Sequence, residues 1–308
     1  MIRKSVLFIF AYMAASPLWA IPVPPPAIPQ GLVQFSSDSL TYALVVEKKT
    51  QSLRLYEVKN DYYSLVKSYK VATGEGQGSK LRVGDKRTPE GVYTFTNVLE
   101  RKKILPKHGV RAFVTNYPNV FDRRANKTGS GIWLHGTNEP ERISTGFVTE
   151  GCVALTNDDL QELQKYIKIG DTPLLVYESI PMVDFTALKN FQKEIHALIA
   201  AWKTAWEQEN IKAYMEFYSP SKFRSKRMNW KGWRDYKNNL AKNYSNISLI
   251  FDQMKILNHQ ESLVVQFNQY YHSDLHEDFG KKTLYLSKEE GIWKIISEEW
   301  TAVNVEKS

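Results

Sequence analysis

The only cysteine of the chain and a histidine 17 positions before it have the side chains that thiol catalysis needs. Cys152 directly follows Gly151, and residues 132–134 form a short apolar run that ends at His135. Such a run predicts a buried strand, and glycine allows the tight turn that brings a backbone close to a ligand. An imidazole near a thiol can remove its proton, and the thiolate then attacks a carbonyl carbon. The spacing therefore predicts a cysteine nucleophile with a histidine base.

The start of the chain bears on how this thiol is interpreted. Arg3 and Lys4 precede an apolar run over residues 5–15, and Ala20 offers a small residue for cleavage. This pattern is typical of a secretory signal peptide, and the run is shorter than the roughly 20 residues of a membrane-spanning helix. We expect residues 1–20 to be removed and the mature protein to lie in the periplasm. The alternative is an uncleaved membrane anchor.

A single cysteine is informative in an exported protein, because exported proteins use cysteines mainly in disulfide pairs. Cys152 has no partner within the chain, and an exposed thiol is open to oxidation. A reactive nucleophile explains why such a thiol is present. The alternative is an inert thiol that packs as a small apolar side chain.

Several motifs of the chain resemble those of a known family. H-G-T-N at 135–138 and T-E-G-C-V at 149–153 resemble the signature of the L,D-transpeptidase (YkuD) catalytic domain, and T-P-E-G within 84–91 resembles its upstream segment. Three further segments resemble peripheral motifs of the YafK-type branch: 117–119, 122–123 and 128–131. The resemblance covers residues 41–178 and implies a mainly β catalytic domain there. It departs from the family at Ala154, where many members have an Arg or Asn that contacts the substrate.

The resemblance also implies roles for individual residues. The carbonyl of Gly136 would orient the imidazole of His135, and backbone N–H groups near Gly151 and Cys152 would stabilise an oxyanion. Five side chains are further candidates for substrate binding, although the hydroxyl groups among them could equally cap loops: Tyr117, Arg123, Ser144, Thr145 and Thr149. No cofactor or metal is expected, since the sequence lacks ligand spacing such as H-E-x-x-H.

The substrate implied by the family is the peptidoglycan stem tetrapeptide, cut at the bond between meso-diaminopimelate and D-Ala through a thioester on Cys152. An amine on another stem peptide or on a wall-attached lipoprotein or other periplasmic protein would make the enzyme a transpeptidase. Water as the acceptor would make it an L,D-carboxypeptidase. The sequence leaves both open, and a non-catalytic wall-binding scaffold is a third reading.

The elements that must hold these residues are predicted from hydrophobic patterning. Residues 21–40 are rich in proline and are expected to be an extended linker. Short apolar runs with polar breaks predict strands of a mostly antiparallel sheet: 42–47, 52–56, 65–71 and 92–95. Residues 100–127 are polar and are expected to form an irregular insertion, either a lid or a solvated loop, with His108 on its surface.

The composition changes after Tyr177. Residues 184–208 have apolar side chains at helical spacing, which predicts a long amphipathic helix, and a short helix over 211–218 follows. Later runs predict four strands: 247–257, 262–271, 282–286 and 292–297. This order indicates an α+β cone over 183–305 and is similar to the nuclear-transport-factor-like (SnoaL-like) fold. We expect this domain to bind substrate or a partner, and such domains can form homodimers through the sheet.

The two domains together resemble the cell-shape L,D-carboxypeptidases of curved and helical bacteria. The formal net charge of +8 becomes +6 without the signal peptide, which suits anionic wall polymers, although an ordinary soluble surface would look the same. No nucleic-acid-binding module is present in the sequence. The basic segment 222–227 with Trp230 and Trp233 could suit a glycan, but we expect a solvated face with packed aromatic rings.

Overall fold

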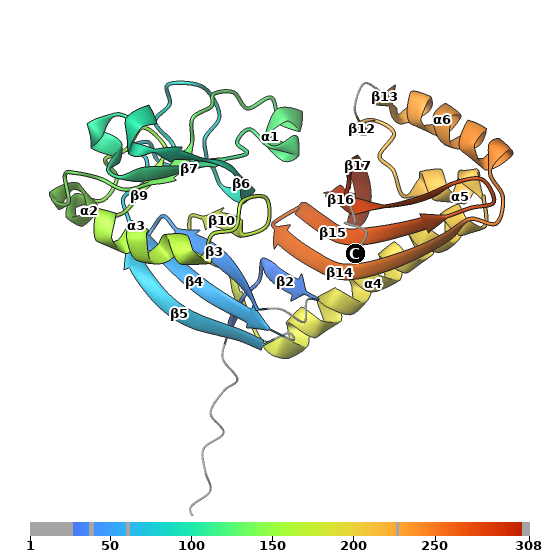
Figure 1. Cartoon of the computed structure of the whole chain (residues 1–308), viewed down its shortest axis with the longest axis horizontal. Helices are drawn as coiled ribbons and strands as arrows, with labels where there is room; N and C mark the ends of the chain where they lie inside the picture. The colour runs from blue at the N-terminus through green and yellow to red at the C-terminus, as the bar shows by residue number, and fades with distance from the viewer. Residues whose placement is uncertain (1–26, 37–39, 60–61, 226–227, 304–308) are drawn as a thin grey trace, which may run out of the picture.

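The computed structural model of the chain describes residues 27–36, 40–59, 62–225 and 228–303. The predicted signal peptide lies outside the described residues. Figure 1 shows two domains side by side, one coloured blue to green and the other yellow to red. No helix among the described residues is long and apolar enough to span a membrane.

The N-terminal domain is organised around one eight-stranded sheet with the order β5-β4-β3-β10-β6-β7-β8-β9. Its strands are β3 (Thr41–Glu47), β4 (Ser52–Lys59), β5 (Tyr62–Lys70), β6 (Gly91–Glu100), β7 (Arg111–Thr115), β8 (Trp133–His135), β9 (Val153–Ala154) and β10 (Pro173–Tyr177). Its short helices are η1 (Arg101–Lys103), η2 (Pro106–His108), α1 (Val120–Arg124), α2 (Glu141–Thr145), α3 (Asn157–Leu163) and η3 (Gln164–Tyr166). Most neighbouring strands are antiparallel, but β10 pairs with β3 in parallel, and so do β8 and β9.

One face of this sheet is packed with apolar side chains that alternate along the strands, as the sequence pattern predicts. Phe95, Phe113, Leu134 and Val153 come from four successive strands and belong to one buried cluster. The residues that neighbour them along each strand therefore point to the opposite face of the sheet. That opposite face carries the histidine at the end of β8.

The C-terminal domain packs helices against a five-stranded antiparallel sheet with the order β17-β16-β15-β14-β2. Its long strands are β14 (Ser248–His259), β15 (Ser262–His272), β16 (Glu277–Glu289) and β17 (Ile292–Ala302), and its helices are α4 (Phe185–Glu207), α5 (Ile211–Glu216) and α6 (Trp230–Asn243). Asp184 caps α4 by accepting the N–H of Ala187, which explains where the predicted helix begins. A small hairpin of β12 (Arg224–Ser225) and β13 (Met228–Asn229) precedes α6.

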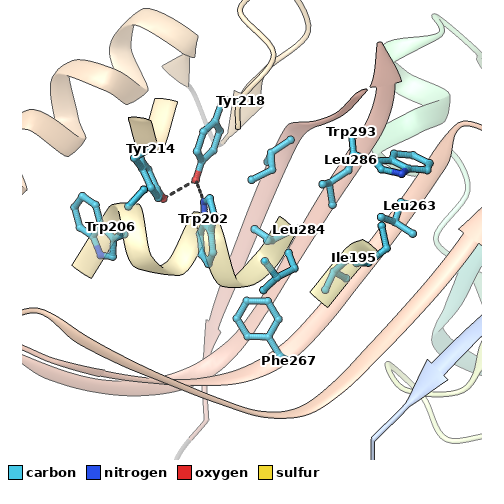
Figure 2. Packing of buried hydrophobic residues seen from close by; sticks show 14 of the residues in the cluster. Ile195, Trp202, Trp206, Tyr214, Tyr218, Leu263, Phe267, Leu284, Leu286 and Trp293 are labelled. Carbon is cyan, nitrogen blue, oxygen red and sulfur yellow. Dashed lines mark hydrogen bonds between the residues drawn. The ribbon is translucent and has the colours of Figure 1, made fainter. Parts of the chain in front are cut away.

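The inner face of the C-terminal sheet and the apolar face of α4 form the core of this domain. Figure 2 shows Trp202 of α4 beside Tyr214 and Tyr218, with Phe267 and Leu284 of the sheet nearby. The indole N–H of Trp202 donates to the Tyr218 hydroxyl at 3.0 Å, so this buried polar atom is satisfied. The observed helix-then-sheet order agrees with the predicted α+β cone. Helix α6 was not predicted, because lysines and asparagines between its aromatic residues obscure the apolar face.

The expectation of a plain linker over residues 21–40 is wrong for part of that range. β1 (Ile28–Pro29) pairs with β11 (Met182–Val183), and β2 (Leu32–Phe35) pairs with β14 at the edge of the C-terminal sheet. All four residues of β2 are buried: Leu32 and Phe35 belong to an apolar cluster with residues of both domains, and Val33 belongs to the core of the C-terminal domain. The start of the described chain therefore joins both domains.

The expectation of an irregular insertion over residues 100–127 is also wrong in part. The segment contains β7, which is a central strand between β6 and β8, followed by the short helix α1. The apolar run of this strand covers only residues 112–114 between Arg111 and Thr115, so it is too short to stand out in the sequence. The remaining part, which includes η2, folds back over the end of β8.

Candidate active site

The pairing of β8 with β9 places the histidine and the cysteine on one face of the sheet. Leu134 lies opposite Val153, and His135 lies opposite Ala154. Leu134 and Val153 are buried in the core, so His135 and Ala154 point to the other face. Cys152 is two residues before Ala154 and has the same orientation. The parallel register thus brings the two predicted catalytic side chains together.

The turn before Cys152 is held in an unusual conformation. Gly151 has φ +120°, and a Cβ there would lie 2.6 Å from the carbonyl oxygen of Arg87. The hydroxyl of Thr149 accepts the N–H of Gly151 at 3.1 Å and donates to the carbonyl of Cys152 at 2.7 Å. Only glycine fits at position 151, and the threonine fixes the turn.

The Cys152 thiol is held between two backbone groups of β8 and the segment before it. The N–H of Trp133 lies 3.4 Å from Sγ, and the thiol donates to the carbonyl of Gly131 at 3.3 Å. Burial raises the pKa of the thiol to about 11, against the opposing effect of the Trp133 N–H. At neutral pH the sulfur therefore carries its proton.

The imidazole of His135 is buried and oriented by the neighbouring residue. Its Nδ1 lies 2.5 Å from the carbonyl oxygen of Gly136, which can only accept a hydrogen bond. The ring proton is therefore on Nδ1, and Nε2 keeps the lone pair that a base needs. Burial lowers the pKa of His135 to about 4, although the Gly136 carbonyl opposes this shift. The resting pair is a neutral thiol and a neutral imidazole.

The pair faces a cavity of about 50 Å³. The residues that line it are Ala72, Lys107, His108, His135, Thr137, Arg142, Ile143, Val148, Thr149, Glu150, Cys152 and Ala154. Because Ala154 lies directly opposite His135, its small side chain leaves this space open. The position where the sequence departs from the family is thus part of the site.

The expectation that His108 is a surface residue is wrong. Its ring centroid lies 4.8 Å from that of His135 and 5.0 Å from that of Trp133, both edge to face. Burial lowers the pKa of His108, and Nδ1 is buried with no hydrogen-bond partner among the described residues. Sequence reasoning missed it because its position depends on η2 folding back over β8, which no local pattern shows.

Two cations of the cavity were also not singled out from the sequence. Arg142 donates to Glu139 at 3.1 Å and to the carbonyl of Val148 at 2.5 Å. Lys107 lies 3.7 Å from a carboxylate oxygen of Glu150. Each cation is paired with a carboxylate, and both remain hydrogen-bond donors at the cavity from which a substrate carboxylate can accept.

Four of the predicted substrate-binding residues do not line this cavity. The Tyr117 side chain is buried, and its hydroxyl donates to the carbonyl of Thr128. Ser144 and Thr145 are exposed on α2, where the Thr145 hydroxyl donates to a backbone carbonyl of its own helix. Arg123 lies at a separate cleft between the domains. These positions depend on packing that single residues in a motif do not reveal.

The backbone donors near the thiol are only partly available for an oxyanion. The N–H of Gly151 is already donated to Thr149, so the expectation that it helps to bind an oxyanion is not met by this geometry. The N–H of Cys152 has no acceptor in the described part of the chain. Across the described residues no group of three or more His, Cys, Asp or Glu side chains could hold a metal ion.

Comparisons with known families agree with this architecture. The L,D-transpeptidase catalytic domain matches residues 41–176, and the Cds6 C-terminal NTF2-like domain matches residues 194–299. These matches confirm the predicted fold class of a mainly β catalytic domain followed by a nuclear-transport-factor-like domain. They cover the cysteine site and the α4–β17 domain respectively.

Individual relatives differ in how much they cover. The chain is 30% identical over 122 residues to the putative L,D-transpeptidase YafK of Escherichia coli K12, which is 39% of this chain and 44% of that protein. The chain thus matches less than half the length of this curated relative. The structure of Bd1075 from Bdellovibrio bacteriovorus shares 34% identity and a TM-score of 0.81, over 91% of this chain and all of that chain.

A second solved structure supports the fold alone. It is that of the helical cell shape determining protein Pgp2 from Campylobacter jejuni, with 23% identity and a TM-score of 0.70 over 87% of this chain and 95% of that chain. Both domains of the chain therefore occur together, in the same order, in solved structures.

Proposed function

Because the chain belongs to the L,D-transpeptidase (YkuD) family and carries a Cds6-type NTF2-like domain after the catalytic domain, we propose that it cleaves peptidoglycan stem peptides through a thioester on Cys152. The observation that carries this proposal is the shared sheet face of Cys152 and His135, with Gly136 fixing the imidazole proton on Nδ1. This leaves Nε2 as the base beside a protonated thiol.

The first half-reaction follows from that neutral pair. The Sγ–H bond of Cys152 breaks as its proton moves to Nε2 of His135, and sulfur forms a bond to the carbonyl carbon of meso-diaminopimelate. The oxyanion that forms is bound by the free N–H of Cys152. The imidazolium then gives its proton to the amine of D-Ala, the C–N bond breaks, and the thioester remains.

The turn residues serve this step without contacting the bond that reacts. Thr149 and the close approach of Gly151 to Arg87 hold the Cys152 N–H and the thiol in one orientation. Holding these groups in place before the substrate arrives removes a reorganisation cost from the reaction. The carboxylate of the terminal D-Ala would lie toward Lys107 and Arg142.

The second half-reaction distinguishes two activities. Water or an amine attacks the thioester, gives its proton to His135, and the sulfur leaves and regains a proton. Ala154, opposite His135, lacks a longer side chain that would hold an acceptor amine. We therefore favour L,D-carboxypeptidase activity over transpeptidation as the outcome.

The wider role follows from the same proposal. We propose a periplasmic location, because peptidoglycan is the proposed substrate and the N-terminal sequence pattern predicts export. The shared two-domain fold with Pgp2, a helical cell shape determining protein, suggests a role in cell shape through trimming of tetrapeptides. A non-catalytic wall-binding scaffold would need neither the oriented imidazole nor the Thr149 turn.

The experiment is incubation of the mature protein with disaccharide tetrapeptide, followed by mass spectrometry, with Cys152→Ala as the control. We expect disaccharide tripeptide and free D-Ala, both absent with the variant. Cross-linked dimers, or exchange of D-Ala for an added D-amino acid, would instead establish transpeptidation. Wall binding without any Cys152-dependent product would contradict the proposal and support the scaffold.

A further inference from the structure

A second cavity, of about 580 Å³, lies between the two domains and away from the cysteine site. One wall comes from β6 and the segment around α1, and the other comes from β15, β16 and β17 (Figure 1). Arg123 lies here, so this residue of the family-like motif faces the interdomain cleft. Nothing in the proposed chemistry at Cys152 uses this space.

The alternation of the strands determines which side chains enter the cleft. On β16, Leu284 and Leu286 pack into the core of the C-terminal domain, so Lys281 and Thr283 point outward. On β6, Phe95 packs into the core of the catalytic domain, so Thr94 points outward. The cleft is therefore formed by the polar faces of two sheets.

The cleft and the cysteine site also share a face of the catalytic sheet. Leu134 of β8 and Phe95 of β6 belong to the same core cluster. Their neighbours His135 and Thr94 therefore both point to the opposite face of the sheet. Strand β7 lies between β6 and β8 in the sheet. A ligand that extends along this face can therefore reach from one site toward the other.

The charges in the cleft favour an anion. Arg123 donates to the carbonyl of Pro118, and neither it nor Lys281 forms an ion pair within 4 Å among the described residues, although Lys281 helps to lower the pKa of Asp171. Lys255 is paired with Asp171 at 2.6 Å. A smaller adjoining cavity of about 210 Å³ is also lined by Lys281, Lys255 and Asp171, and it adds Lys168. Four cations thus face two carboxylates, those of Asp171 and Glu299.

The neutral groups indicate what kind of anion fits. Thr94, Asn116 and Thr283 line the cleft with hydroxyl and amide groups, which pair well with peptide bonds. Tyr285 is the aromatic side chain of the lining, but its ring packs on Phe121 and its hydroxyl donates to Glu299. Because its ring is already engaged, the cleft offers little for stacking a sugar. An extended peptide with free carboxylates matches both the charge and the polar walls.

We propose that the interdomain cleft binds a second acidic stem peptide of the wall polymer, next to the stem peptide that reacts at Cys152. The proposal rests on the proposed function, because it takes peptidoglycan as the substrate. Arg123 and Lys281 bind its carboxylates, and the threonine and amide side chains bind its backbone. In this arrangement the second domain helps to select polymer that carries neighbouring stems.

The test uses the full chain with Cys152→Ala, so that the peptide is not turned over. The probe is a soluble stem tetrapeptide with free carboxylates, titrated by isothermal calorimetry. We expect two binding sites. Adding Arg123→Ala and Lys281→Ala to this protein should weaken the affinity of one site by about 100-fold, roughly tenfold for each charge-assisted contact removed. With Lys281→Arg in place of Lys281→Ala, the tenfold loss assigned to Lys281 should not occur, because arginine keeps the charge.

Two controls make the outcome decisive. The control variant Lys231→Ala/Lys242→Ala removes two exposed lysines of α6 and should leave both binding sites unchanged. The melting temperatures of the cleft variant and the control variant should match that of the Cys152→Ala protein. The proposal is overturned if the Arg123/Lys281 variant keeps both sites, if the peptide with amidated carboxylates binds equally well, or if disaccharide without peptide competes for the cleft. Failure of the proposed function would appear separately, as absence of Cys152-dependent product from the unmutated protein.

Discussion

The cysteine–histidine site of the catalytic domain and a buried cluster in the C-terminal domain both shield ionisable side chains from water, but in different ways. At the catalytic site His135 is buried and Cys152 is half-buried, and neither side chain forms an ion pair with another described residue. In the C-terminal domain Glu298 is buried with Lys282 at 3.2 Å, and Lys237 lies nearby over the ring of Trp206 at 4.0 Å. The contrast shows how one chain separates reactive groups from structural ones.

The pKa shifts follow from this difference. Burial is the largest cause that raises the pKa of Cys152 to about 11 and lowers that of His135 to about 4, so both groups are neutral at pH 7. Burial would raise the pKa of Glu298, but Lys282, Lys237 and hydrogen bonds outweigh it and leave the pKa below its usual value. Burial lowers the pKa of Lys237 to about 8. Unpaired groups stay neutral and available, whereas the paired carboxylate stays charged and fixed.

Removal of the proposed base, His135, is the first test of the contrast between the reactive pair and the buried ion pair. His135→Gln keeps a polar side chain of similar size but cannot take the thiol proton. We expect kcat for tetrapeptide cleavage to fall by about 10³-fold, since general base catalysis contributes about 10²–10⁴. The melting temperature should change little. Turnover within tenfold of the unmutated protein would show that another group accepts the proton.

The matching change in the other domain should affect stability and leave chemistry intact. Glu298→Gln keeps the shape but leaves Lys237 and Lys282 without the carboxylate, and removal of one partner of a buried pair costs about 3–5 kcal/mol. We expect that loss in the free energy of unfolding, measured by urea titration. Glu299→Gln, at the exposed neighbouring position, is the control. A fall in kcat of the folded variant would contradict a purely structural role.

The turn before the nucleophile allows a sharper test within the catalytic domain. Gly151→Ala places a Cβ 2.6 Å from the Arg87 carbonyl, so the turn must move and carry the thiol with it. We expect kcat to fall about 100-fold, as small misplacements of reacting groups do. Gly170→Ala also has a positive φ (+74°) but no atom within 4 Å. This control should cost about 1 kcal/mol of stability and no activity.

The neutral state of the pair can be read from the pH dependence of alkylation. With the thiol pKa raised to about 11 and the His135 pKa lowered to about 4, thiolate is scarce at pH 7. The rate of Cys152 alkylation by iodoacetamide should therefore rise about tenfold for each pH unit between 7 and 10. A plateau beginning near pH 6 would instead indicate a thiolate–imidazolium pair and would contradict the neutral resting state.

Local patterns predicted the parts of the fold that depend on local physics. The apolar periodicity over residues 184–208 predicted α4, and the apolar run before His135 predicted β8. The motif around Cys152 identified the two side chains that the parallel β8–β9 register brings together. In these cases neighbouring residues alone determine the structure.

Long-range pairing could not be predicted in the same way. The pairing of Phe35 with Lys255 joins segments more than 200 residues apart, so the proline-rich start was taken for a linker. His108 enters the site only because η2 folds over Trp133. Arg123 belongs to a family-like motif, yet it faces the interdomain cleft. Its place depends on how the two sheets pack, which no spacing in the sequence records.

The most direct test of the central claim is to trap the acyl group on the protein. The full chain is mixed with excess tetrapeptide, and the reaction is quenched in acid within one turnover. The mass of the intact protein is then measured by mass spectrometry before and after treatment with hydroxylamine. We predict an adduct with the mass of the acyl group, located on Cys152 by peptide mapping and removed by hydroxylamine, and absent from Cys152→Ala. Formation of product by Cys152→Ala, or an adduct at any other residue, would contradict the account.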